Sequence, residues 1–341
     1  LRLIPRTFWV GLAMIVATEA LLFVDVAKRG GLVVGEDVTV ADLPDPTDRL
    51  WQAGRWAGFN ITPVCWVGYL LVFDGLLTTL ARRRSDPAIA SLRDRPNRFV
   101  VAWLTSIPVW CFFDYVNFKY MDAWRYHGLP PSAATRTLGY FVAFAAISPG
   151  MFLAAHFFQH LGARRLVTRG AKVNRALPWA VLVGVNVILA GSALLLMRYA
   201  ETRADERVGF ALSAAMLLGP GVVLSLVARR LTIASLGFGV GFTLWAVVVR
   251  DPVGNMALWV GLIFLLDPVA GWLGGPSILR DWRAGRWGRM LALFAGGALC
   301  GLLWEFWNYW AISKWTYHLP FLGSLEEYRY FEMPVLGFLG F

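Results

Sequence analysis

The sequence has few charged residues, few histidines and few cysteines. Charged residues make up only 16% of the 341 residues, whereas soluble domains carry about 25%. The three cysteines, Cys65, Cys111 and Cys300, all lie in apolar runs and form no C-x-x-C pair. This pattern excludes a disulfide scaffold and predicts buried free thiols. The small share of charged residues also excludes a conventional soluble enzyme, and the chain lacks a glycine-rich phosphate loop between a strand and a helix.

Apolar and aromatic residues fill the sequence instead. Hydrophobic residues account for 57%, with 17 Trp and 23 Phe, and the mean hydropathy is +0.56. We therefore predict an all-α polytopic integral membrane protein whose single membrane domain covers residues 1–341. Runs of about 18 or more apolar residues predict about ten spans, namely 8–27, 61–81, 99–118, 138–161, 176–197, 208–228, 232–249, 256–273, 290–311 and a tenth that begins near 332.

The loop charges predict how the chain is oriented. With the N-terminus in the cytoplasm, the cytoplasmic segments hold 19 basic and three acidic residues, and the opposite segments hold 13 basic and 12 acidic residues. The positive-inside rule favours this topology, so we expect a multi-pass inner-membrane protein with a cytoplasmic N-terminus. The net charge of +10 then reflects orientation, and we expect no nucleic-acid partner. Membrane lipids are the expected partners, and in one hypothesis other membrane subunits are as well.

One outer loop of the predicted topology is long. The loop runs over 28–60, and its end, 48–56, carries tryptophans that favour an amphipathic segment along the membrane interface.

The chain starts at Leu1 and stops at Phe341 inside an apolar run. We therefore expect one or both true ends to be missing, and a signal peptide cannot be judged.

The chain resembles itself at a shift of about 192 residues. Identical or similar residues recur at a spacing of 193 residues in the first part of the match and of 191 residues in the second part. This predicts a duplicated three-helix unit, repeat A (about 60–160) and repeat B (about 255–341), joined by linking spans over 176–249. An even number of spans separates the copies, so both should point the same way and be related by an axis normal to the membrane. The matched pairs are Trp66/Trp259, Gly68/Gly261, Asp74/Asp267, Asp114/Glu305, Asn117/Asn308, Trp124/Trp315, Tyr126/Tyr317 and His127/His318.

Two carboxyls near the outer ends of their spans are the main candidates for chemistry. Asp114 lies three residues before Asn117, and Glu305 three residues before Asn308, so each pair shares a helix face. An acid inside a membrane span is costly and marks a functional candidate. We predict Asp114 and Glu305 as an acid pair and the two asparagines as groups that orient it. The alternative is that each acid/Asn pair caps its helix and bonds to the loop that follows.

The loops after these helices, together with the last acid, supply the predicted walls of a ligand site. Each loop carries a Trp-x-Tyr-His motif, and an acid opens the tenth predicted span. If the repeats face each other, these side chains line one cavity in the outer half of the membrane. The predicted ligand-binding residues are Trp124, Tyr126, His127, Trp315, Tyr317, His318 and Glu332.

The remaining polar residues carry weaker predictions. Asp74 and Asp267 precede basic loops, and pairing with loop arginines explains them. Glu19 lies deep in the first span and could pair with Asn186. His156 and His160 share one helix face, which cannot supply both axial ligands of one haem. The sequence therefore disfavours haem and metal and leaves any cofactor unknown.

The repeat unit resembles the lycopene cyclase domain of the heterodimeric, membrane-embedded type. In that family an acid ends one span, a W-x-[FY] follows about ten residues later, and a further acid lies near the next span. Here Asp114 leads to Trp124-Arg125-Tyr126, Glu305 leads to Trp315-Thr316-Tyr317, and Glu332 opens the next predicted span. The family's P-x-E-E motif is absent. The resemblance covers roughly 60–160 and 255–341, and it implies isoprenoid cyclisation by proton donation.

Three functions follow as hypotheses. The leading one is a protein that binds a hydrophobic isoprenoid- or lipid-like ligand in the outer half of the membrane and acts on it by acid catalysis. The second is a non-catalytic transmembrane subunit of a larger electron-transfer or pigment complex. The third is a proton-coupled transporter that uses Asp114 and Glu305.

Overall fold

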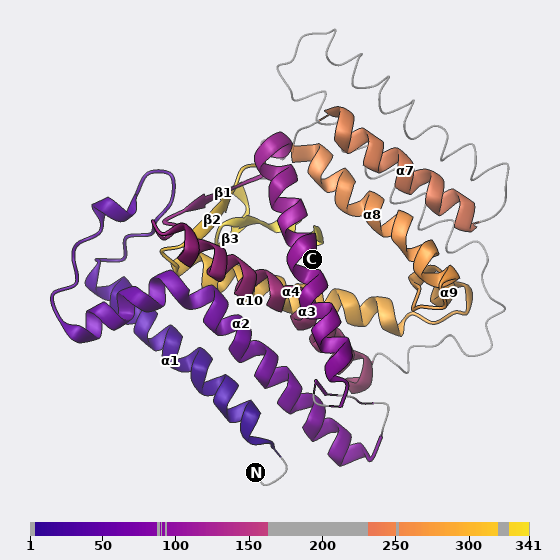
Figure 1. Cartoon of the computed structure of the whole chain (residues 1–341), viewed down its shortest axis with the longest axis horizontal. Helices are drawn as coiled ribbons and strands as arrows, with labels where there is room; N and C mark the ends of the chain where they lie inside the picture. The colour runs from indigo at the N-terminus through magenta and orange to yellow at the C-terminus, as the bar shows by residue number, and fades with distance from the viewer. Residues whose placement is uncertain are drawn as a thin grey trace.

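The computed structural model describes residues 4–86, 89, 91–92, 94–162, 231–249, 252–319 and 327–340. The predicted spans 176–197 and 208–228, and with them Asn186, lie outside the described residues. Figure 1 shows long helices packed side by side, with short strands gathered near one end of them. The helices are α1 (Arg6–Lys28), α2 (Arg49–Arg84), α3 (Pro96–Val116), α4 (Ala133–Leu161), α7 (Leu231–Val249), α8 (Pro252–Trp272), α9 (Ile278–Arg283) and α10 (Gly288–Trp310).

The helices support the membrane class. Within the described ranges, five helices are long and apolar enough to cross a bilayer: α1, α2, α3 with its π-helical extension, α4 and α10. Shorter apolar stretches lie in α7 and α8. The mostly helical, membrane-type architecture thus agrees with the predicted class, while the total of ten spans stays a prediction.

Helix α2 begins much earlier than the predicted span. Its 36 residues correspond to roughly 54 Å, which exceeds a hydrocarbon core of about 30 Å. Asp48 caps its first turn by accepting a hydrogen bond from the Trp51 amide at 2.8 Å. The segment 48–56, expected along the membrane interface, thus forms the N-cap and first turns of α2, and its position relative to the membrane stays a prediction. Hydropathy shows only the apolar part of a helix, and the polar N-terminal turns of α2 fall below that signal.

The all-α prediction missed two small antiparallel sheets. Strand β1 (Trp124–His127) pairs with β2 (Lys314–Tyr317), and β3 (Arg329–Tyr330) pairs with β4 (Met333–Pro334). The β1–β2 pair joins segments that lie far apart along the chain. Strands this short leave no periodic signal in the sequence, because their pairing depends on the partner strand. We call the end of the helical bundle where β1 and β2 lie the strand end.

The predicted tenth span does not begin as an α-helix. Phe331 has a left-handed backbone with φ 54°, β4 follows, and Val335–Gly340 forms 3₁₀ turns. Pro334 lacks an amide donor and interrupts a helical ladder at this point. Over its described residues, this segment therefore folds back against the strand end.

Glycine contacts bring two pairs of helices close together. A Cβ on Gly11 of α1 would lie 2.5 Å from the carbonyl oxygen of Gly68 in α2. A Cβ on Gly239 of α7 would lie 3.0 Å from the carbonyl oxygen of Gly261 in α8. Small residues at such crossings let apolar helices approach closely, which is how membrane helices associate.

The largest core cluster joins α1, α2, α4 and α10. At its centre is Trp66, fully buried, with ring centroids 5.6 Å from Trp304 and 5.8 Å from Trp307. This packing holds the C-terminal half of α10, which carries Glu305 and Asn308, against α2.

Candidate functional site

Both asparagines clamp the strand that follows their helix. The Asn117 side chain donates to the Trp124 carbonyl and accepts from the Ala123 amide, each at 2.7 Å. The Asn308 side chain donates to the Trp315 carbonyl at 2.8 Å and accepts from the Trp315 amide at 2.9 Å. Both residues are buried. These contacts tie each helix end to its strand, as in the structural alternative drawn from the sequence.

Asp114 lies within a closed set of hydrogen bonds. Its carboxylate accepts from the Trp124 indole at 3.0 Å and from the Tyr126 hydroxyl at 3.1 and 3.2 Å. Burial, and next the negative charge of Asp114, hold the pKa of Tyr126 well above its ordinary value. A neutral tyrosine hydroxyl is therefore the donor to this carboxylate. Both oxygens of Asp114 have partners.

Glu305 occupies the matching position on α10 with an incomplete set of bonds. Its Oε1 accepts from the Tyr317 hydroxyl at 2.8 Å, and that hydroxyl in turn accepts from the Trp315 indole at 2.8 Å. Burial keeps the pKa of Tyr317 well above its ordinary value as well. Glu305 is fully buried, and its Oε2 has no hydrogen-bond partner in the described part of the chain. A buried polar atom without a partner is costly and calls for an explanation.

The register of β1 and β2 places the two halves of the site symmetrically. Trp124 pairs with Tyr317, Arg125 with Thr316, and Tyr126 with Trp315. Shifting by the 191 residues seen in the sequence exchanges the first and third of these pairs and leaves the middle pair unchanged. Directly opposite residues share a face of an antiparallel pair, so Tyr126 and Tyr317, which hold Asp114 and Glu305, lie on the same face of the β1–β2 pair.

Aromatic side chains cross between the two halves. The ring centroids of Trp66 and Trp304 lie 5.6 Å apart, and Trp259 stacks on Phe113 at 3.8 Å. Trp304 further contacts Trp315, with ring centroids 5.3 Å apart. Phe113 and Trp304, which directly precede Asp114 and Glu305, are therefore both packed in aromatic contacts.

A buried lysine that the sequence analysis missed connects the site to Glu332. The Lys314 side chain is 0% exposed, is ion-paired with Glu332, and donates to the Tyr309 carbonyl at 3.1 Å. Burial lowers its pKa, and the charge of Glu332 opposes this shift. Lys314 has alanine, Ala123, at its matched position in repeat A, so no repeat signal marked it. Its charge between apolar stretches was the only available clue.

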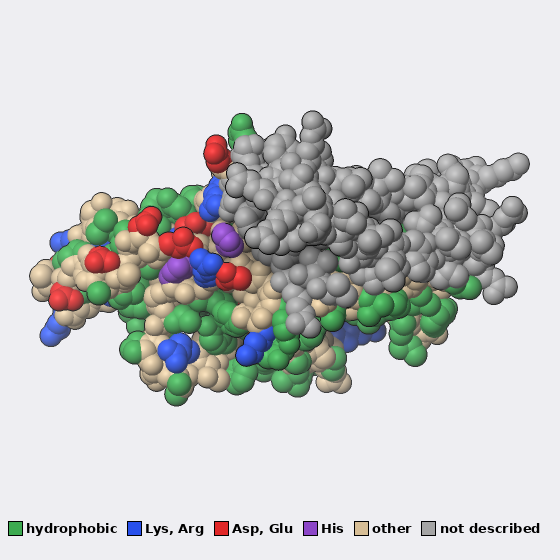
Figure 2. Space-filling view, turned by 90° about the horizontal axis from the view of Figure 1, so that it is seen from above, with side chains coloured by type: hydrophobic (Ala, Val, Ile, Leu, Met, Phe, Trp, Pro, Cys, Tyr) green, Lys and Arg blue, Asp and Glu red, His purple; other side chains and the backbone are tan. Residues whose placement is uncertain are grey.

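The two predicted histidines differ in position. His127 is half-buried, its Nε2 lies 2.8 Å from the Thr316 hydroxyl, and burial lowers its pKa. His318 is exposed, and its backbone amide donates to the Ala123 carbonyl. Figure 2 shows acidic, basic and histidine side chains close together on the face turned to the viewer.

The other acids of the spans accept hydrogen bonds from donors that lie beside them in the fold. Glu19 accepts from the Trp307 indole at 2.8 Å. Asp74 accepts from the Leu92 amide at 2.7 Å. Asp267 accepts from the Ile278 amide at 2.7 Å and from two further donors of the α8–α9 turn. The arginines of that region, Arg286 and Arg289, pair with Asp281. Asp74 and Asp267 thus fasten the loops that follow their helices.

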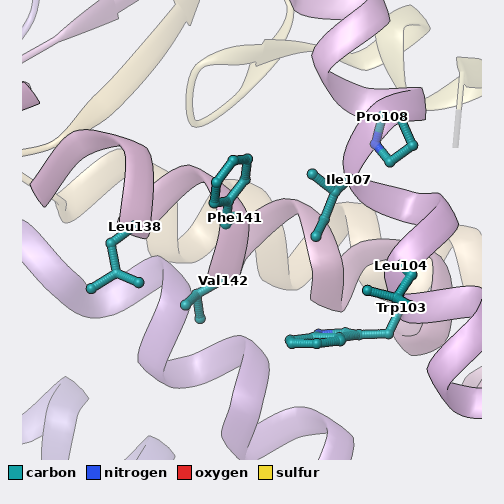
Figure 3. Close-up of a pocket in the computed structure, with 7 residues that line it drawn as sticks. All are labelled: Trp103, Leu104, Ile107, Pro108, Leu138, Phe141 and Val142. Atoms are coloured by element: carbon teal, nitrogen blue, oxygen red, sulfur yellow. The ribbon is translucent and has the colours of Figure 1, made fainter. Parts of the chain in front are cut away.

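An open apolar groove lies between α3 and α4 (Figure 3), with a volume of about 350 Å³. It is lined by apolar side chains alone, so it suits an alkyl or isoprenoid chain rather than a polar solute. Among the described residues, no group of three His, Cys, Asp or Glu is placed to hold a metal. The lining residues are Trp103, Leu104, Ile107, Pro108, Leu138, Phe141 and Val142.

No family model matches this chain, and neither a curated protein nor a solved structure shows significant similarity to it.

Proposed function

We propose that this protein binds an isoprenoid- or lipid-like ligand in the outer half of the membrane and protonates it from Glu305. The observation that carries the proposal is the fully buried Oε2 of Glu305, which lacks a partner in the described chain while Oε1 is held by Tyr317. A proton on Oε2 removes the cost of burying a charge there. The same proton is then available to a ligand.

The surroundings of Glu305 suit proton donation to a double bond. In this step the Oε2–H bond breaks, the π electrons of the alkene form a C–H bond, and the positive charge passes to the neighbouring carbon. The faces of Trp304 and Trp315 stabilise such a cation. The Tyr317 hydroxyl and the nearby charge of Lys314 stabilise the carboxylate that is left. The resemblance to membrane-embedded lycopene cyclases points to the same class of chemistry.

Asp114 differs from Glu305 in this proposal. Its two oxygens already accept from two donors, the Trp124 indole and the Tyr126 hydroxyl, and such hydrogen bonds favour the ionised form. Asp114 is thus the electrostatic partner, and Asn117 and Asn308 keep the two acids in place through the strands.

We also infer an internal duplication, with the strand end facing outward. The β1–β2 register, the matched asparagine clamps and the reciprocal Trp66–Trp304 and Trp259–Phe113 contacts support a two-fold relation between the repeats. The glycine contacts of α1–α2 and α7–α8 extend it by one helix in each copy. The arginine-rich loops then lie on the cytoplasmic side, as does the N-terminus.

The test is an absorption spectrum and lipid mass spectrometry of the protein purified gently from its native membrane. Wild type should retain an isoprenoid- or lipid-like molecule. Glu305→Gln should retain it in unconverted form, while the matched variant Glu19→Gln, whose parent carboxyl is held by Trp307, should not change the product. Identical ligand profiles in wild type and Glu305→Gln would refute the acid role.

Two other outcomes would replace the proposal. Stoichiometric partner chains without a bound ligand would favour the subunit hypothesis. Solute uptake in vesicles that loses its pH dependence in Glu305→Gln would favour the transporter.

A further inference from the structure

Two cationic side chains are fully buried at the strand end, where both contact the C-terminal turn of α10. The Arg29 and Lys314 side chains are both 0% exposed. Arg29 donates from Nη2 to the Trp310 carbonyl at 2.7 Å, and Lys314 donates from Nζ to the Tyr309 carbonyl at 3.1 Å. These carbonyls belong to consecutive residues, so the two positive charges lie close together.

The hydrogen bond to the end of α10 satisfies only one of the three guanidinium nitrogens of Arg29. Its Nε and Nη1 have no hydrogen-bond partner in the described chain, and the same holds for the Trp310 indole nitrogen. The nearest carboxylate oxygen, Asp25 Oδ2, is 3.7 Å from Nε, beyond hydrogen-bond distance, while Asp25 Oδ1 accepts from Trp51 and Arg55 at 2.9 and 2.8 Å. A buried guanidinium normally fills its donors, and it fits a carboxylate or phosphate with two parallel bonds.

The charges of this cluster do not balance in the state that protonation requires. The cations are Arg29, Arg55 and Lys314, and the acids are Asp25, Glu332 and Glu305; His127, lowered in pKa by burial, faces Lys314 from β1. If Glu305 carries a proton, one positive charge is left without a counterion. Buried charges are rarely left uncompensated.

We propose that Arg29, Lys314 and the Trp310 indole form a binding site for an oxyanion, the carboxylate or phosphate head group of an amphiphile. This rests on the proposed function and narrows its ligand class, because a pure hydrocarbon offers no acceptor to these donors. The Glu332 side chain, 15% exposed, marks where the cluster reaches the surface and where a head group enters. The apolar tail then extends along the helices into the membrane.

The experiment uses the full chain in phosphatidylcholine nanodiscs, with phosphatidic acid and inorganic phosphate as probes. Binding is measured by native mass spectrometry and by the shift in thermal unfolding. Wild type should bind phosphatidic acid, and Arg29→Gln and Lys314→Gln should each weaken binding about tenfold or more. The matched control is Lys28→Gln, since Lys28 is a neighbouring cation that is 52% exposed. Equal affinity in all four proteins would overturn the site.

A charge-preserving variant controls for misfolding, and competition between the two probes identifies the source of the anion. Arg29→Lys keeps the charge and loses the fork, so in a folded protein it should bind more weakly than wild type; unchanged binding would contradict the site. Inorganic phosphate that competes with phosphatidic acid supports the oxyanion site, and binding of phosphate alone assigns it to a free anion. If phosphate stabilises wild type but not Arg29→Gln while no amphiphile co-purifies, the anion site stands and the proposed function fails.

Discussion

Individual polar side chains at the strand end form hydrogen bonds with groups that lie far along the chain or on the next element. The asparagines hold strands, the tyrosines hold carboxyls, and Arg29 and Lys314 hold the last carbonyls of α10. Each of these groups is buried, so its partner decides whether it stabilises or destabilises the fold. Substitutions at this scale should therefore be costly even without a ligand.

Replacing Asn308 by alanine removes two hydrogen bonds to buried backbone groups of Trp315. We expect the free energy of unfolding to fall by about 2–4 kcal/mol, because the amide and carbonyl would be left without partners. Unfolding in mixed detergent followed by circular dichroism measures this change. The control is Asn60→Ala, which removes only a local bond to the Trp56 carbonyl and should cost less than about 0.5 kcal/mol. Equal losses would contradict the clamp.

Tyr126 and Tyr317 should set the alkaline limit of stability. Burial raises the pKa of both above the ordinary 10.0, so the folded state binds these protons more tightly than the unfolded state. Their contribution is fully present below pH 10 and is lost as the pH rises above it. Tyrosinate absorbance should show Tyr126 and Tyr317 to be among those of the ten tyrosines that ionise only as the protein unfolds. The Tyr126→Phe, Tyr317→Phe double variant should reduce the amplitude of this late step by the absorbance of two tyrosines; an unchanged amplitude would refute the assignment.

At the scale of elements, close helix crossings and one strand pair hold the bundle together. Apolar helices in a membrane gain little from burying apolar surface against each other, so close packing at glycines matters more than in water. The β1–β2 pair adds backbone hydrogen bonds between the two halves.

The crossing of α1 and α2 should not tolerate a methyl group at Gly11. Its Cβ would lie 2.5 Å from the Gly68 carbonyl oxygen, so the helices must separate in Gly11→Ala. We expect a loss of about 1–3 kcal/mol, measured by unfolding in detergent. Gly139→Ala is the matched control, because a Cβ there meets nothing within 4 Å and alanine favours the helix. A neutral Gly11→Ala would mean that the crossing is looser than described.

At the scale of the whole molecule, labelling of single cysteines in two loops tests the proposed orientation across the membrane. The proposed topology places the α1–α2 loop outside and the α2–α3 loop inside. In a variant lacking the three native cysteines, Glu36→Cys should react with an impermeant maleimide in spheroplasts of the bacterial host. Ser85→Cys should react only after lysis. The reverse pattern would invert the topology and move the proposed site to the inner leaflet.

Much of this molecule follows from local properties of the chain. Length, hydropathy and the sign of loop charges each add up over neighbouring residues, so they predict the membrane class and most described helices to within a few residues. The recurrence of residues at a shift of about 192 also marked Asp114, Glu305 and the two Trp-x-Tyr motifs as candidates. Each asparagine lies only a few residues before the loop that it holds, so a hydrogen bond between them could also be predicted from the sequence.

Other features depend on residues that are distant in sequence, and only the folded chain decides them. The pairing of β1 with β2, the burial of Arg29 and Lys314, and the difference between a saturated Asp114 and a half-satisfied Glu305 belong to this class. The cost of burying a charge or a polar atom is set by what surrounds it in space. A carboxyl with two donors and one with a single donor therefore look alike in sequence and differ in chemistry once the helices have packed.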